Sequence, residues 1–263
     1  MRHLLFSPSR LFSFTALLSA CAVFSAPSLA QMVTDDTGVQ GAGGNQLEVS
    51  YDWERTRSGG ETERVYSIPV TYTYGLTDSV DIFASVAYAR IRVPGDRVDG
   101  FGNTAIGGKW NFFENEASGT SLAIGAELAL PVSSQRERDG LGTGKTSGSV
   151  NFILSQEVPF GAVHVNAGWG RERFRQSEDN ATNRHFSVAP VWEIADQWQL
   201  TFDTGIDWSR SGGETVRSKY AAMSVIYSPN EDLDLEVGYM RATDDESPRA
   251  RTHSVAATLS WRF

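Results

Sequence analysis

The final stretch of the chain, residues 253–263, constrains the fold more than any other. Successive side chains of a β-strand point to opposite faces. The face formed by every second residue here carries His253, Val255, Ala257, Leu259, Trp261 and Phe263. The residues of the opposite face are small or polar, namely Ser254, Ala256, Thr258, Ser260 and Arg262. Such a strand, apolar on one side to its last aromatic residue, fits the closing strand of a transmembrane β-barrel, whose outer face contacts lipid.

Residues 1–30 have the features of a secretory signal peptide. Arg2 and Arg10 give a basic start, an apolar run follows, and Ala30 ends a small-x-small pattern of the kind that a signal peptidase cuts. A second interpretation is a lipoprotein, because Leu18-Ser-Ala-Cys21 also fits a lipidation site with Cys21 as the modified residue. Export from the cytoplasm follows from either interpretation.

Composition excludes several classes of function. Cys21 is the only cysteine, so a chain that starts at Gln31 has no disulfide and no thiolate metal site. The formal net charge is −9, and loss of Arg2 and Arg10 with the leader makes it more negative. An acidic protein is a poor partner for nucleic acid. We expect no cofactor and no nucleic-acid partner.

From Asn45 onward, apolar and polar residues alternate. The first run places Leu47, Val49, Tyr51 and Trp53 on one face. About twelve such runs of roughly ten residues follow one another, an even number as closed bacterial barrels have. The mean hydropathy of −0.29 does not oppose a membrane location, because a barrel alternates apolar and polar residues. We predict an all-β fold: a signal peptide at 1–30, a flexible N-terminal segment at 31–44, and a transmembrane antiparallel up-and-down β-barrel at 45–263.

The connections between these runs alternate in length. Those after odd strands are polar and mostly long, and those after even strands are mostly short, which is typical of extracellular loops and periplasmic turns. The expected loops lie at residues 56–62, 93–102, 133–146, 171–184, 209–216 and 243–250. A soluble β-sandwich also alternates with period two, but it does not explain the leader, the terminal aromatic strand and the loop asymmetry together. The expected location is the outer membrane of a Gram-negative bacterium.

The same alternation directs a mostly acidic set of side chains into the lumen. It comprises Glu48, Asp52, Asp81, Glu127, Glu157, Glu193, Asp203, Asp207, Asp234 and Glu236, with Lys109, Arg262 and His164. An acidic lumen attracts cations and repels anions. The alternative is that these carboxylates only solvate the interior and pair with basic groups, without setting selectivity. Our candidates for residues that tune passage are Lys109, Glu127, Glu157, His164, Asp203, Asp207 and Arg262.

Occlusion of the lumen is a further possibility, by residues 31–44 or by the loops at 93–102 and 133–146. The expected partners are outer-membrane lipid and lipopolysaccharide, the barrel-assembly machinery through the strand that ends at Phe263, and a small-molecule solute. The acidic run Asp244-Asp-Glu246 either binds a divalent cation that bridges lipopolysaccharide or is simply solvated.

Enzymatic chemistry has little support in the sequence. The segment Gly140-Leu-Gly-Thr-Gly-Lys-Thr146 resembles a phosphate-binding loop, but Asp139 stands where that motif needs glycine. His164 shares its inward face with Asn166, and Ser149 or Ser155 of the preceding strand could lie beside it, which is only loosely a catalytic triad. A hydrogen-bonded lumen histidine is the alternative. His185 and His253 begin strands and are expected at the outer rim.

Three motifs in order carry a family resemblance. They are Tyr74-Gly-Leu-Thr-Asp78, Gly100-Phe-Gly-Asn-Thr-Ala-Ile-Gly-Gly-Lys-Trp110, and Leu130-Pro-Val followed by Gly140-Leu-Gly-Thr-Gly144. With them the chain, over residues 45–263, resembles the outer-membrane family named for the MetA pathway of phenol degradation. Asn103, Trp110 and the Val132-Ser133 pair depart from the family's usual Asp, Tyr and Thr-Gly.

The resemblance implies an outer-membrane barrel that transports hydrophobic or aromatic compounds, and it implies no catalytic residues. The functional hypothesis is passive passage of small solutes, either such compounds or cations through the acidic lumen. A non-conducting structural or adhesion barrel is the second hypothesis. A barrel lipid hydrolase that uses His164 is the third.

Overall fold

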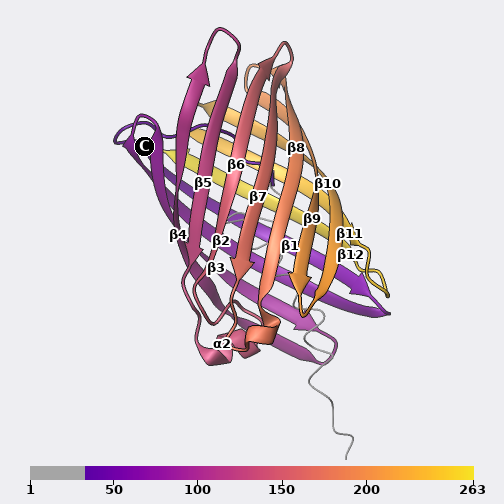
Figure 1. Ribbon diagram of the computed structural model, residues 1–263. Helices are drawn as coiled ribbons and strands as arrows, with labels where there is room; N and C mark the ends of the chain where they lie inside the picture. Colours follow the sequence, from indigo (N-terminus) through magenta and orange to yellow (C-terminus); the bar gives the residue numbers. More distant parts are fainter. Residues whose placement is uncertain (1–32) are drawn as a thin grey trace, which may run out of the picture.

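The computed structural model describes residues 33–263, which form a closed barrel of antiparallel strands (Figure 1). Each strand pairs with the next along the chain, and β12 pairs with β1. The predicted fold is therefore confirmed. The predicted signal peptide and its alternative lipidation site at Cys21 lie outside the described residues.

Twelve strands and two short helices make up the barrel and its connections. The strands are β1 (Asn45–Ser58), β2 (Glu61–Thr77), β3 (Val80–Val93), β4 (Asp96–Asn115), β5 (Thr120–Ala129), β6 (Ser147–Val158), β7 (Gly161–Glu172), β8 (Ala181–Ala195), β9 (Trp198–Ser211), β10 (Glu214–Asn230), β11 (Leu233–Asp244) and β12 (Arg251–Arg262). The helices are α2 (Ser134–Arg138) and the 3-10 helix η2 (Ser177–Asp179). No helix among these residues is long and apolar enough to cross a bilayer.

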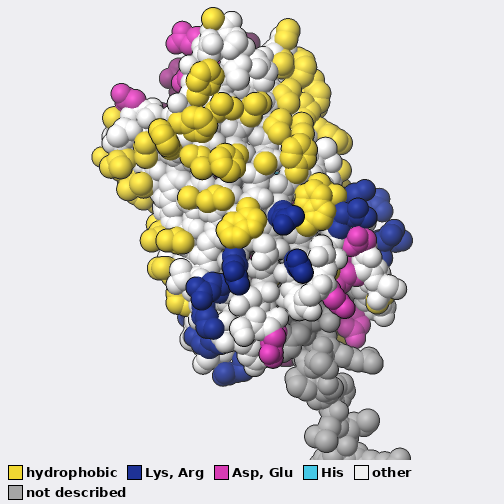
Figure 2. Space-filling view, viewed as in Figure 1, with side chains coloured by type: hydrophobic (Ala, Val, Ile, Leu, Met, Phe, Trp, Pro, Cys, Tyr) yellow, Lys and Arg dark blue, Asp and Glu magenta, His cyan; other side chains and the backbone are white. Residues whose placement is uncertain are grey.

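Burial in this barrel is inverted relative to a soluble protein. Inward-facing Asn166 and Asp203 are 0% and 1% exposed, whereas outward-facing Phe152 and Val237 are 56% and 60% exposed. On the face seen in Figure 2, the outward apolar side chains form a broad band across the wall. Soluble proteins rarely expose so continuous an apolar surface to water. The outer face of the barrel is therefore built to contact lipid.

The final strand closes the barrel, as its alternation predicts. The register of β1 on β12 runs from Gln46 opposite Arg262 to Arg57 opposite Arg251. Beyond it, the backbone N–H of Phe263 donates to the carbonyl of Asn45 at 3.0 Å, and the N–H of Asn45 donates back at 3.2 Å. Closure leaves no unpaired strand edge.

The prediction of a long loop is wrong at three of the six positions. Residues 56–62, 93–102 and 209–216 are mostly strand, and each connection shrinks to a tight turn. The turns contain glycines with positive φ, namely Gly59, Gly60, Gly95, Gly212 and Gly213. The outward face becomes polar there, so the apolar alternation ends, but the backbone ladder continues. Loss of alternation therefore indicated where the strands leave the apolar band, not where they end.

The two ends of the barrel differ. The longer connections, residues 130–146, 173–180 and 245–250, lie at one end, which we name the loop end. At the other, the turn end, the connections are short and include residues 78–79 and 231–232. Helix α2 marks the loop end in Figure 1.

Candidate functional site

Residues 33–44, here the N-terminal segment, run into the lumen from the turn end. Where the segment joins β1 at the turn end, the N–H of Gly43 donates to the carbonyl of Gly75 at 2.8 Å, and the N–H of Gly75 donates to the carbonyl of Gly44 at 2.9 Å. A Cβ on Gly75 would lie only 1.7 Å from the carbonyl oxygen of Gly41. Position 75 therefore has to be glycine for the segment to sit here.

Lumen side chains hold the middle of the segment. The N–H of Gln40 donates to both carboxylate oxygens of Asp81, at 3.1 and 3.0 Å. The N–H of Asp35 donates to Oδ1 of Asn166 at 2.9 Å, and Nδ2 of Asn166 donates back to the carbonyl of Asp35 at 2.8 Å. Irregular backbone inside a barrel needs such partners, because the strands use their own N–H groups in the ladder.

The inner end of the segment is fixed by Thr34. Its N–H donates to Oδ2 of Asp203 at 2.8 Å, and its hydroxyl lies 2.7 Å from Oγ of Ser187 and 2.8 Å from Oδ1 of Asp203. The hydroxyl of Tyr220 donates to the same carboxylate at 2.9 Å. Val33 packs on a small apolar cluster that includes Tyr220. Asp203, one of the predicted residues, thus anchors the segment.

The hydrogen-bonded side chains continue from Ser187 to His185, which was expected from sequence at the outer rim. Nε2 of His185 lies 2.8 Å from Oγ of Ser187, and Nδ1 lies 2.7 Å from Oδ1 of Asp207. The side chain of His185 points inward and is buried. The signal that could have placed it was the apolar residue that follows, Phe186, whose outward position sends its neighbour inward.

Asp207, His185 and Ser187 repeat the order of contacts of a catalytic triad. Ser187 is 0% exposed, and Thr34 lies against its hydroxyl. Ser187 is also paired on both sides within the sheet, to β7 and β9. A substrate carbonyl therefore has neither access to Ser187 nor free backbone donors beside it, as an oxyanion requires. The arrangement anchors the segment.

Lys109 bridges the wall to the acidic part of the segment. Its ammonium lies 3.4 Å from Oδ1 of Asp35 and 3.7 Å from Oδ1 of Asp36, and it donates to the carbonyl of Asp36 at 3.2 Å. The predicted lumen lysine thus binds residues 35 and 36. From sequence, these residues were expected either in a flexible segment or in a segment that occludes the lumen.

A cavity of about 190 Å³ remains between the N-terminal segment and the wall formed by β1 to β6. Most of the residues that line it are polar, and its charged members are Asp35, Glu48, Asp81, Lys109 and Glu127. Two of the seven predicted residues, Lys109 and Glu127, therefore line the open space. Four carboxylates and one ammonium give this space a negative balance.

The other predicted residues lie elsewhere. His164 is buried with Nδ1 2.7 Å from Oγ of Ser155, a hydroxyl that also accepts the N–H of Thr37 at 3.1 Å. Asn166 bonds to the N-terminal segment and not to His164, so the loose triad is not assembled. At the turn end, Glu157 is exposed, and Arg262 pairs with Asp234 at 2.5 Å.

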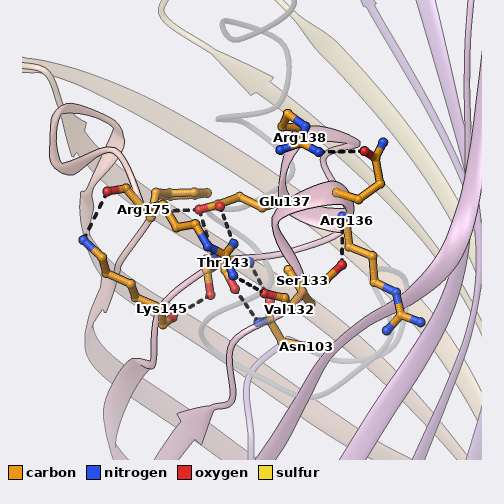
Figure 3. A network of polar contacts seen from close by, with 12 residues as sticks. Asn103, Val132, Ser133, Arg136, Glu137, Arg138, Thr143, Lys145 and Arg175 are labelled. Carbon is orange, nitrogen blue, oxygen red and sulfur yellow. Dashed lines mark hydrogen bonds and ion pairs between the residues drawn. The ribbon is translucent and has the colours of Figure 1, made fainter.

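At the loop end, residues 130–146 fold against the 173–180 connection (Figure 3). Oε1 of Glu137 accepts the N–H of Arg175 at 2.8 Å, and Oε2 accepts its guanidinium at 2.5 Å. The same guanidinium donates to the carbonyl of Val132 at 2.8 Å. Burial alone would raise the pKa of Glu137, but the hydrogen bonds from Arg175 and Gly144 hold it below its usual value.

A second contact ties this loop to β4. Nδ2 of Asn103 donates to the carbonyls of Leu130 and Thr143 at 2.6 and 3.0 Å, and its Oδ1 accepts the N–H of Thr143 at 2.8 Å. A Cβ on Gly142 would lie 2.3 Å from that Oδ1. Two of the motifs that carried the family resemblance therefore meet here. Across residues 33–263, no group of His, Cys, Asp and Glu side chains is placed to hold a metal ion.

Comparison with known proteins identifies the family. The model of the family named for the MetA pathway of phenol degradation matches residues 30–263. The chain belongs to this family. No curated protein matches it in sequence. In this member of the MetA-pathway family, residues of the motifs hold the N-terminal segment and the 130–146 loop in place.

Solved structures similar to this family member are outer-membrane barrels. The outer membrane channel COG4313 from Pseudomonas putida F1 has a TM-score of 0.70 at 14% identity, over 87% of this chain and 98% of that one. The β domain of the Bordetella autotransporter BrkA has a TM-score of 0.55 at 15% identity, over 84% and 100%. The NanC porin has a TM-score of 0.52 at 10% identity, over 80% and 98%. The protein is an outer-membrane β-barrel.

Proposed function

We propose that this barrel is a passive channel for small solutes, that it favours cations, and that the N-terminal segment sets its aperture. The observation that carries the proposal is the cavity of about 190 Å³ beside the segment. Its lining has four carboxylates, Asp35, Glu48, Asp81 and Glu127, and one basic side chain, Lys109. The channel and porin folds of similar barrels support the transport class.

The lining also bears on the kind of solute. Carboxylates that face a narrow aqueous space surrounded by low-dielectric walls lower the free energy of a cation and raise that of an anion. Phe83 is the one aromatic side chain that lines the cavity within the described chain. The excess of carboxylates and the single aromatic ring therefore favour small cationic solutes over the aromatic compounds that the family's name suggests.

Single-channel recording in a planar bilayer under a potassium chloride gradient tests the proposal. We expect steady conductance and a reversal potential whose sign indicates that cations pass more readily than anions. The double variant Glu48→Gln and Glu127→Gln should move that potential toward zero. The matched control is Glu231→Gln with Asp232→Asn, which removes the same charge from a turn outside the cavity. Anion preference, or equal effects of the two double variants, would contradict an acidic pore.

A closed resting state is the second candidate, and the hydrogen bonds along residues 34–42 favour it. In this state the barrel is silent until the segment leaves the lumen. Wild-type recordings with brief or no openings, together with steady openings after the segment is loosened, would support it.

A further inference from the structure

The outer wall carries a row of basic side chains near the loop end. The row crosses six neighbouring strands, and each member lies directly opposite the next across the ladder. In order from β11 through β12, β1, β2 and β3 to β4, the members are Arg241, His253, Arg55, Arg64, Arg92 and Arg97. We name it the arginine row.

Juxtaposed cations destabilise a sheet unless anions lie between them. The wall supplies one acid here, Asp99, which pairs with Arg97 at 3.1 Å. Among the ion pairs of residues 33–263, none involves Arg55, Arg64 or Arg92. Nε of Arg55 is buried without a hydrogen-bond partner. The row therefore suits anions that come from outside the protein.

The row lies at the border of the apolar band. The next level toward the turn end is Tyr239, Val255, Trp53 and Tyr66, also in register, and on β3 and β4 it continues with Arg90 and Asp99. The guanidinium of Arg92 lies over the ring of Tyr66, 5.5 Å from its centroid. On the face seen in Figure 2, Lys and Arg side chains likewise gather beside the apolar band toward the loop end.

The basic border is confined to one side of the membrane. On the described strands, the lipid-facing positions nearer the turn end than the level of Arg90 carry no Lys or Arg, and Arg262 at that end faces inward. Long loops mark the extracellular side of such barrels. The row therefore lies at the headgroup level of the outer leaflet.

We infer that the arginine row binds the phosphate groups of lipopolysaccharide. The lipid A part of that molecule carries phosphates on the sugar headgroup to which its acyl chains are attached. This headgroup lies at the level of the row, above the aromatic side chains. Guanidinium groups match phosphate oxygens with paired hydrogen bonds, and five of the six members of the row are arginines. The bound phosphates separate the facing cations, and the acyl chains lie on the apolar band.

Binding of lipid A to the full chain in detergent, measured by native mass spectrometry, tests this inference. We expect bisphosphorylated lipid A to bind at least about tenfold more tightly than its dephosphorylated form. The triple variant Arg55→Gln, Arg64→Gln, Arg92→Gln should lose that difference. The control Arg136→Gln, Arg138→Gln, Arg249→Gln removes equal charge from loops at the same end and should keep it.

A thermal measurement adds an independent readout. Without lipid A, the row variant should melt above the wild type because the repulsion is gone. Lipid A should raise the Tm of the wild type and of the control variant, but not that of the row variant. Equal binding of phosphorylated and dephosphorylated lipid A overturns the inference. So does equal loss in the two triple variants, or binding of phosphatidylglycerol as tight as that of lipid A.

Discussion

Single residues explain why the family motifs have the composition they do. Gly75 leaves room for the carbonyl of Gly41, and Asp78 of the same motif accepts the N–H of Ala42 at 3.2 Å. Asn103 uses its amide as both donor and acceptor. From sequence alone the role of Asn103 was open, because the family often has Asp there. In this chain the two carbonyls beside it require a donor.

Substitution Asn103→Asp therefore places a carboxylate against the carbonyls of Leu130 and Thr143. Loss of these bonds costs about 1–3 kcal/mol, so the 130–146 loop should open about five to 150 times more often. Trypsin cleavage after Arg136 and Arg138 in the folded protein measures this opening. In the control Asn115→Asp, the side chain only accepts, from the N–H of Ser118. Unchanged cleavage in Asn103→Asp would show that the loop does not depend on this amide.

Among the elements, the N-terminal segment gives the sharpest test of gating. Substitution Gly75→Ala should displace the segment from the turn end, because the added methyl group overlaps the carbonyl of Gly41. We expect conductance to rise several-fold while the barrel stays folded. The control Gly125→Ala adds a methyl group that has room, 4.0 Å from the nearest backbone oxygen, and should not raise conductance.

The strands could be predicted because the two faces of each strand contact different solvents. Their ends could not, since the ladder continues through residues 93–102 after the apolar alternation stops. The position of residues 33–44 was also open from sequence, because the segment has no period and its partners, such as Asp81 and Asp203, are distant in the chain. Parity alone placed Lys109 and Glu127 in the lumen, but only the folded segment decides which lumen residues line the remaining cavity.

At the scale of the whole molecule, charge is sorted by surface. Many carboxylates are buried inside, and most arginines lie on the outer wall or in the connections at the loop end. The exposed, outward cations are screened by salt, as are the charges in a hydrated lumen.

We therefore expect the cation preference of the channel to weaken as salt rises, because the Debye length falls from about 30 Å at 0.01 M to about 3 Å at 1 M. Reversal potentials measured at a fixed concentration ratio over this range test the expectation. A cation preference that does not change with salt would indicate exclusion by size at the cavity, and not by its carboxylates.

The seam between β1 and β12 has a consequence for how the barrel forms. Its pairs, such as Trp53 with Val255, join residues from opposite ends of the described chain, so the loop closed by this contact contains almost the whole barrel. Contacts between such distant residues are slow to form, because the entropy of closing the loop is lost before the contact stabilises the chain. Unfolding has to break the same continuous ladder, with no free edge at which to begin. Slow folding and a long-lived native state are therefore two results of one closure.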